Sequence, residues 1–203
     1  LEDYLRESKV GYEILTRNLG RASDLISSFK QMAVDQTSSK RRTFNLDTLV
    51  KEVITTLNPS IKKYAVDIKI QIPESIELNS YPGALGQIIT NLVNNAMIHG
   101  LEGKVGGLIN IRGEVVDNSK VRITFTDNGK GIPPEYIDSI FNPFFTTKLG
   151  QGGSGLGLNI VYNTSENILK GHITVSSALN HHTTFALTIP LNPPKPIDIV
   201  ADD

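Results

Sequence analysis

A polar stripe runs along one face of a predicted helix that is otherwise apolar. Asn91, Asn95 and His99 follow one another at intervals of four residues, which places them on the same side of an α-helix. Buried amides need partners, because an amide without a hydrogen bond costs about 1–3 kcal/mol. An amide oxygen also suits Mg²⁺, which takes its remaining ligands from water and phosphate. The competing interpretation is a solvated helix face.

A carboxylate followed by glycines ends a predicted strand at 121–127. Asp127 leads into Asn128-Gly129-Lys130-Gly131-Ile132, where glycine lets the backbone approach a ligand closely. A buried carboxylate at a strand end can accept a hydrogen bond from an exocyclic amine, as adenine recognition requires. For the first three residues alone, an ordinary Asp-Asn-Gly turn is the favoured alternative. The continuation through Pro133 favours the adenine site.

A third segment combines aromatic residues with phosphate-binding side chains. The stretch 141–145 holds three phenylalanines in five residues, which favours burial and a segment that closes over something. Thr146, Thr147 and Lys148 follow directly and could then reach phosphate. For Lys148 an ordinary surface position is an equally good interpretation. We expect residues 142–154 to form a mobile lid that needs phosphate contacts to become ordered.

The fourth segment is Gly152-Gly153-Ser154-Gly155-Leu156-Gly157-Leu158, which opens a helix predicted for about 155–169. Free backbone N–H groups and the positive dipole end at a helix N-terminus form a phosphate cradle in principle. The segment is not a P-loop, because no Lys-Ser/Thr follows its last glycine. It does not look like a Rossmann turn either, because no strand immediately precedes it.

In this order, between residues 91 and 158, the four segments resemble the N, G1, F and G2 boxes of the ATP-binding domain of sensor histidine kinases. The resemblance extends over nearly the whole chain, to about residue 191. It implies binding of ATP and Mg²⁺, with Asn95 as the metal ligand and Asp127 at adenine. The nucleotide contacts that it implies are Asn91, Asn95, His99, Asp127, Gly129, Gly131, Ile132, Thr146, Thr147, Lys148, Gly153, Ser154, Gly155, Leu156, Gly157 and Leu158.

Sensor histidine kinases belong to the GHKL superfamily, whose members differ at the position of Asn91. Members that hydrolyse ATP carry a glutamate where Asn91 stands, and an amide cannot accept a proton from water. The expected reaction is therefore transfer of the γ-phosphate to a protein histidine, for relay to an aspartate of a response-regulator receiver domain. The alternatives are an anti-sigma-type regulatory module that binds nucleotide without histidine transfer, and an ATP-fold domain that has lost binding.

Three departures from the family pattern stand out. Ile98 occupies a position that is usually basic, so one phosphate contact could be lost. Asn180-His181-His182-Thr183 stands where the family has Gly-x-Gly-Thr. None of the four histidines is followed by Glu or Asp, so we expect the phosphoacceptor to lie on an upstream helix outside this chain. No catalytic residue is therefore assigned within it.

Composition narrows the classes of function further. The net charge of −1 gives no basic field for nucleic acid. The absence of cysteine excludes disulfide scaffolds and cysteine-based zinc sites, and fits a reducing compartment. No apolar run is long enough to cross a membrane. We expect a cytoplasmic fragment without membrane contact of its own, from a protein that could be anchored elsewhere, since the chain begins at Leu1.

Periodicity predicts an α+β fold, a Bergerat-type α/β sandwich with helices on one face of a mixed sheet, preceded by a long helix at 1–36. Apolar residues from Tyr12 to Ala33 alternate three and four apart, as in a coiled coil. This seam predicts a homodimer; packing on the body of the chain is the alternative. Residues 1–40 resemble the second helix of a dimerisation hairpin plus linker, 41–191 the catalytic domain, and 192–203 a flexible tail. The remaining expected elements are helices at 44–57, 82–99, after 133–134 and at 155–169, and strands at 65–72, 107–116, 121–127, 172–178 and 183–190.

Overall fold

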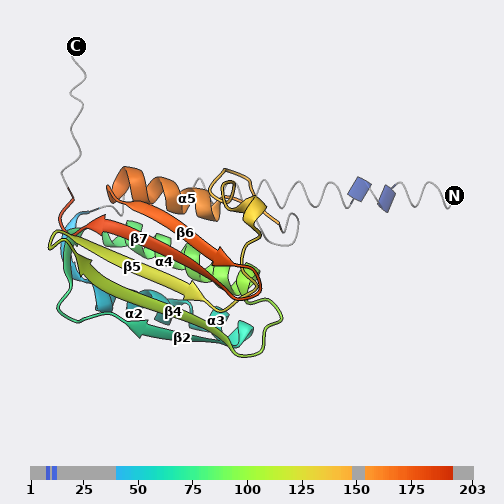
Figure 1. The fold of residues 1–203 in the computed structure, drawn as a ribbon, viewed down its shortest axis with the longest axis horizontal. Helices are drawn as coiled ribbons and strands as arrows, with labels where there is room; N and C mark the ends of the chain where they lie inside the picture. The colour runs from blue at the N-terminus through green and yellow to red at the C-terminus, as the bar shows by residue number, and fades with distance from the viewer. Residues whose placement is uncertain (1–7, 10, 13–39, 148–153, 194–203) are drawn as a thin grey trace, which may run out of the picture.

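The computed structural model describes residues 8–9, 11–12, 40–147 and 154–193 (Figure 1). The predicted helix at 1–36 lies outside this part of the chain, except for residues 8–9 and 11–12, which are helical. The predicted dimer seam and most of the tail are therefore not described. Among the described helices, none has the length and apolar character to cross a membrane.

The centre of the fold is a five-stranded sheet in the order β2-β4-β5-β7-β6. Only the β2–β4 pair is parallel, and the other three pairs are antiparallel, so the sheet is mixed as predicted. Alternate residues of the central strand β5 (Lys120–Asp127), among them Val121, Ile123 and Phe125, are buried against the helices. The other strands are β2 (Val66–Gln71), β4 (Gly107–Val116), β6 (His172–Ala178) and β7 (His182–Pro190).

Helices α2 (Leu46–Thr56), α4 (Pro82–Asn95) and α5 (Gly157–Asn163) form the second layer. Figure 1 shows α4 behind the middle of the sheet, with α5 along one side of it and α2 toward the other. Helix α4 has Pro82 at its start, as predicted, and Leu85, Ile88 and Ile89 are fully buried. Two π-helical turns continue α4 over Ala96–Gly100 and α5 over Thr164–Ile168.

Three short elements differ from the sequence prediction. Strand β1 (Arg42–Asn45) pairs antiparallel with β3 (Glu77–Ser80) in a separate small sheet, so Phe44 belongs to a strand and not to a helix. Strands of four residues are too short to show alternation in a sequence. Pro59 opens a second helix, α3 (Asn58–Tyr64), where we expected only the end of α2. The short helix predicted after Pro133-Pro134 is present as a 3-10 helix at Pro134–Tyr136.

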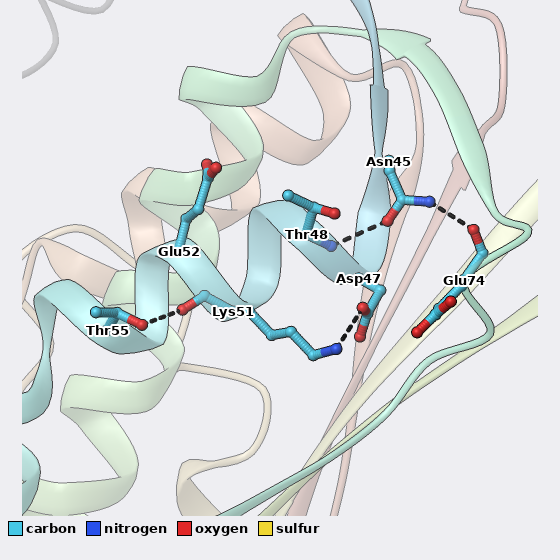
Figure 2. A pocket seen from close by; sticks show the side chains of 7 residues that line it. All are labelled: Asn45, Asp47, Thr48, Lys51, Glu52, Thr55 and Glu74. Atoms are coloured by element: carbon cyan, nitrogen blue, oxygen red, sulfur yellow. Dashed lines mark hydrogen bonds and ion pairs between the residues drawn. The ribbon is translucent and has the colours of Figure 1, made fainter.

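The start of α2 is fastened to the loop before β3 (Figure 2). Asn45 caps the helix, since its Oδ1 accepts from Thr48 N at 3.0 Å. The Nδ2 of Asn45 donates to the carbonyl of Glu74 at 2.6 Å. Asp47, nearly buried, pairs with Lys51 one turn later at 2.6 Å. These bonds explain the open polar hollow in Figure 2 as a structural junction.

The two ends of the described domain meet at one point. Arg41 Nε donates to the backbone oxygen and to Oδ1 of Asn79, both at 3.2 Å, and its Nη2 donates to Asn192 Oδ1. Asn79 N donates to Leu191 O at 2.9 Å, and Leu191 N donates to Ser119 O at 2.8 Å. Arg41 therefore ties the first residues of the domain to its last ones, including Asn192, which we had assigned to the tail.

The change Arg41→Gln is expected to lower the free energy of unfolding by about 1 kcal/mol, because it removes hydrogen bonds that join three segments. Arg42→Gln is the matched control, since it removes the same charge from an exposed side chain. The control is expected to stay within about 0.5 kcal/mol of the parent. Urea unfolding followed by circular dichroism measures both, and equal effects of the two changes would contradict the role given to Arg41.

Candidate functional site

A cavity of about 510 Å³ opens where α4, the end of β5 and the β6–β7 turn come together. The structure brings most of the residues predicted from the sequence to its walls. Gly129 and Leu156 lie beside the cavity and are absent from its lining, while Lys148 and Gly153 lie outside the described residues. The predicted residues that line it are Asn91, Asn95, His99, Asp127, Gly131, Ile132, Thr146, Thr147, Ser154, Gly155, Gly157 and Leu158.

The carboxylate of Asp127 forms one end of the cavity. It closes β5, is only 6% exposed, and accepts a hydrogen bond from Gly129 N at 2.9 Å. Burial raises the pKa of Asp127 above its ordinary value of 3.8, against the opposing effects of backbone N–H groups, Gly129 first, and of the nearby His182. The carboxylate is thus partly desolvated and faces a cavity with acceptor capacity to spare.

The place of Asp127 depends on two glycines. A Cβ at Gly100 would lie 2.9 Å from Asp127 Oδ1, and one at Gly129 would lie 2.6 Å from the same oxygen. Lys130 N donates to Gly100 O at 3.0 Å, which fixes the loop after β5 against the end of α4. The end of the helix and the end of the strand can approach this closely only because neither glycine carries a side chain.

The two amides predicted to face phosphate lie against the start of α5. A Cβ added at Gly157 would lie 3.7 Å from Asn91 Oδ1 and 3.8 Å from both amide atoms of Asn95. Among the described residues, no group of three or more His, Cys, Asp or Glu side chains could hold a metal ion. The Asn95 amide oxygen is a suitable ligand for Mg²⁺, and the remaining ligands would have to be phosphate and water oxygens.

The aromatic segment forms one wall of the cavity. Phe145 packs edge-on against Tyr136, with ring centroids 5.6 Å apart, and the buried Ile140 lines the same cavity. The expectation that all three phenylalanines would be buried is wrong for Phe144, which is 59% exposed. Its backbone has φ +67°, and Gly155, at φ +70°, fits against it where a Cβ would overlap. This packing joins the aromatic segment to the glycine-rich one.

The structure adds residues to the cavity that the sequence analysis did not assign. Thr183 pairs directly with Asp127 across β5 and β7. Its segment had been noted only as a departure from Gly-x-Gly-Thr, although the threonine itself was retained. Asn180 also lines the cavity, and its backbone N donates to Lys130 O at 2.6 Å. Apolar walls come from Tyr136, Leu179 and Phe185, which lie outside any motif.

Comparison with known proteins assigns the family. The profile described as "Histidine kinase-, DNA gyrase B-, and HSP90-like ATPase" matches residues 81–193, more than half of the chain. The chain belongs to this family. The matched region is the ATPase domain, which uses a nucleotide, and all the residues that line the cavity lie within it.

Its relatives within this ATPase family are histidine kinases. The sensor histidine kinase ZraS of Salmonella typhimurium is 27% identical over 88% of this chain, and sporulation kinase A of Bacillus subtilis is 29% identical over 88%. The chain spans 37% and 28% of their lengths, about a third.

Solved structures agree with this placement in the ATPase family. The catalytic domain of the histidine kinase ThkA is 33% identical, with a TM-score of 0.67 over 76% of this chain and 97% of that one. A structure of ThkA in complex with the response regulator protein TrrA is 28% identical and covers 90% of this chain, with a TM-score of 0.68. The predicted family and fold class are therefore confirmed.

Binding of ADP is expected to weaken on acidification, starting at a pH above the ordinary carboxyl value of 3.8, because burial raises the pKa of Asp127. The adenine contact predicted for Asp127 from the sequence would favour the ionised form, because the base amine donates to the carboxylate. Affinity is then full at high pH and is lost as the pH falls through the pKa of the free protein. Calorimetric titrations across pH measure the effect.

The controls separate the titratable side chains of the cavity. Asp127→Asn is expected to bind weakly with little dependence on pH, whereas His99→Gln is expected to keep the dependence. An unchanged profile in Asp127→Asn would refute the assignment of the titrating group.

Proposed function

We propose that the chain binds Mg-ATP and donates the γ-phosphate to a histidine on an upstream helix outside this chain. A single cavity lined by both Asp127 and the Asn91–Asn95 stripe carries the proposal. Asn91 and Gly100, which abuts Asp127, are nine residues apart, about 13 Å at 1.5 Å per residue. That separation suits a nucleotide lying along the helix with its base at Asp127.

The adenine base is recognised at the end of the cavity formed by Asp127. The carboxylate accepts a hydrogen bond from the amino group of adenine, in a setting where burial strengthens the bond. Ile140 and Phe145 provide the apolar surface on which a flat base ring can lie. Gly129 and Gly100 keep the carboxylate in place.

The phosphates are bound at the opposite end of the cavity. Asn95 supplies an amide oxygen to Mg²⁺, which neutralises the phosphates when it is bound. Asn91 and the first residues of α5 face the same space, and Thr146 and Thr147 add hydroxyl donors. These groups hold the triphosphate and orient it for in-line attack, which is the main task of a protein in phosphoryl transfer.

The nature of Asn91 favours transfer over hydrolysis. A general base must accept a proton from the attacking water, and an amide side chain cannot. The nucleophile would then be the imidazole of the upstream histidine. The resemblance to a histidine kinase whose structure includes a response regulator supports a receiver domain as the next partner. Use of ATP favours a cytoplasmic location, and dimerisation through residues 1–36 remains part of the proposal.

Paired substitutions should separate the two ends of the cavity. We expect binding of ADP with micromolar affinity in the presence of Mg²⁺, about 7–8 kcal/mol. Asp127→Ala should weaken it about tenfold or more with or without Mg²⁺, whereas Asn95→Ala should mainly remove the gain that Mg²⁺ provides. Asp67→Ala, an exposed aspartate on the edge strand β2, is the matched control. Absence of binding at millimolar nucleotide would overturn the proposal.

The chain alone should not label itself with γ-phosphate. Its histidines lack an acidic neighbour that could act as general base, and His99 lines the nucleotide cavity itself. Incubation with γ-labelled ATP should leave it unlabelled, with turnover near background. Adding a fragment that carries the upstream helix should produce acid-labile label on that fragment. Label mapped to any histidine of this chain would show that the acceptor is misassigned.

A further inference from the structure

Ser177, on the edge strand β6, joins three segments around the Asp127 end of the cavity. Its Oγ accepts a hydrogen bond from Ile132 N at 2.8 Å and donates to the carbonyl oxygen of His182 at 2.9 Å. The same Oγ lies 3.3 Å from the hydroxyl oxygen of Thr183. One side chain therefore contacts the loop after β5 and the start of β7.

The number of hydrogens available fixes the direction of the third bond. A serine hydroxyl has one hydrogen to donate and two lone pairs to accept with. Ser177 uses its hydrogen on His182 O, which as a carbonyl can only accept. It receives the hydrogen of Ile132 N with one lone pair. The bond to Thr183 must then run from the Thr183 hydroxyl to the remaining lone pair of Ser177.

The direction of this hydrogen bond determines whether the Thr183 hydroxyl can donate to a ligand in the cavity or only accept from it. With its hydrogen engaged, the buried Thr183 hydroxyl, part of a residue that is only 4% exposed, presents lone pairs alone. Asp127, its partner in the β5–β7 register, also only accepts in its ionised form. The wall between these two residues is therefore a surface of acceptors.

We propose that Ser177 is a specificity-determining residue: it holds Thr183 as an acceptor, so that this wall selects a purine with hydrogens at position 6. The inference rests on the proposed function. A 6-amino purine can donate to the wall, directly or through a water, whereas a 6-oxo purine brings another acceptor and leaves buried groups unpaired. Ser177 does not line the cavity and acts through Thr183, which makes it a positioning residue.

Ser177 cannot easily reverse its bonds. Turning its hydrogen toward Thr183 would leave the His182 carbonyl without this partner. The segments on both sides are held independently, since Asn180 N donates to Lys130 O at 2.6 Å. The cost of leaving this part-buried carbonyl without its partner thus keeps the hydroxyls in one orientation.

The test is the ratio of affinities for ADP and inosine diphosphate, which differ only at position 6 of the base and at its adjacent ring nitrogen. The parent chain is expected to prefer ADP at least about tenfold. Ser177→Ala frees the Thr183 hydroxyl to donate to the 6-oxo group, so the preference should fall about 3- to 10-fold. Ser177→Thr keeps the hydroxyl and should restore the parent ratio. The exposed neighbour Ser176→Ala is the matched control and should leave it unchanged.

A second variant covers the case in which Ser177→Ala does not fold. Thr183→Val removes the acceptor and leaves the bonds of Ser177 to Ile132 and His182, and it should lower the preference similarly. Equal weakening of both nucleotides by these variants, with the ratio unchanged, would overturn the inference. So would a parent chain that binds the two nucleotides equally well, although nucleotide binding itself would stand. A parent chain that binds neither would overturn the proposed function instead.

Discussion

The close approach of the end of α4 to the end of β5 is the contact on which the cavity depends. Gly100 and Gly129 both lie against the Asp127 carboxylate, at separations that leave no room for a Cβ. Because of this contact, the amide side chains on the polar face of α4 and the carboxylate at the end of β5 line the same cavity. A side chain at either glycine would push the helix from the sheet and separate the amide stripe from the carboxylate.

The two ends of the cavity differ in how firmly they are held. Around Asp127, backbone hydrogen bonds connect the loop after β5 to the end of α4 and to the β6–β7 turn. At the end proposed to hold the phosphates, Phe144 keeps a left-handed backbone with most of its side chain exposed, which costs on the order of 1–3 kcal/mol in a bulky residue. In the proposed function, the firmly held Asp127 end binds the base, and the strained segment lies beside the phosphates, which must react and leave.

The strongly periodic elements were predictable, and so were the residues whose motifs lie next to one another in the chain. Strands β4 to β7 and helix α4 lie where alternation and the amide stripe placed them. The four-residue strands β1 and β3 and the short helix α3 were missed because such short segments show no periodic pattern of apolar residues. Ser177 and Thr183 were missed for another reason. Their positions beside the cavity come from contacts between segments far apart in the sequence, and nothing in the sequence distinguishes Ser177 from a serine on the surface.

The junction at Arg41 has a geometric consequence. Lys120 and Asp127 lie at opposite ends of β5, and the last residues of the domain leave beside Ser119, close to where Arg41 is bound. The Asp127 end of the cavity is therefore about 23 Å from that junction at 3.3 Å per strand residue. The chain enters and leaves the described domain at one end of β5, and the cavity opens at the other. A rotation of the domain about this junction would therefore displace the cavity more than any residue close to Arg41.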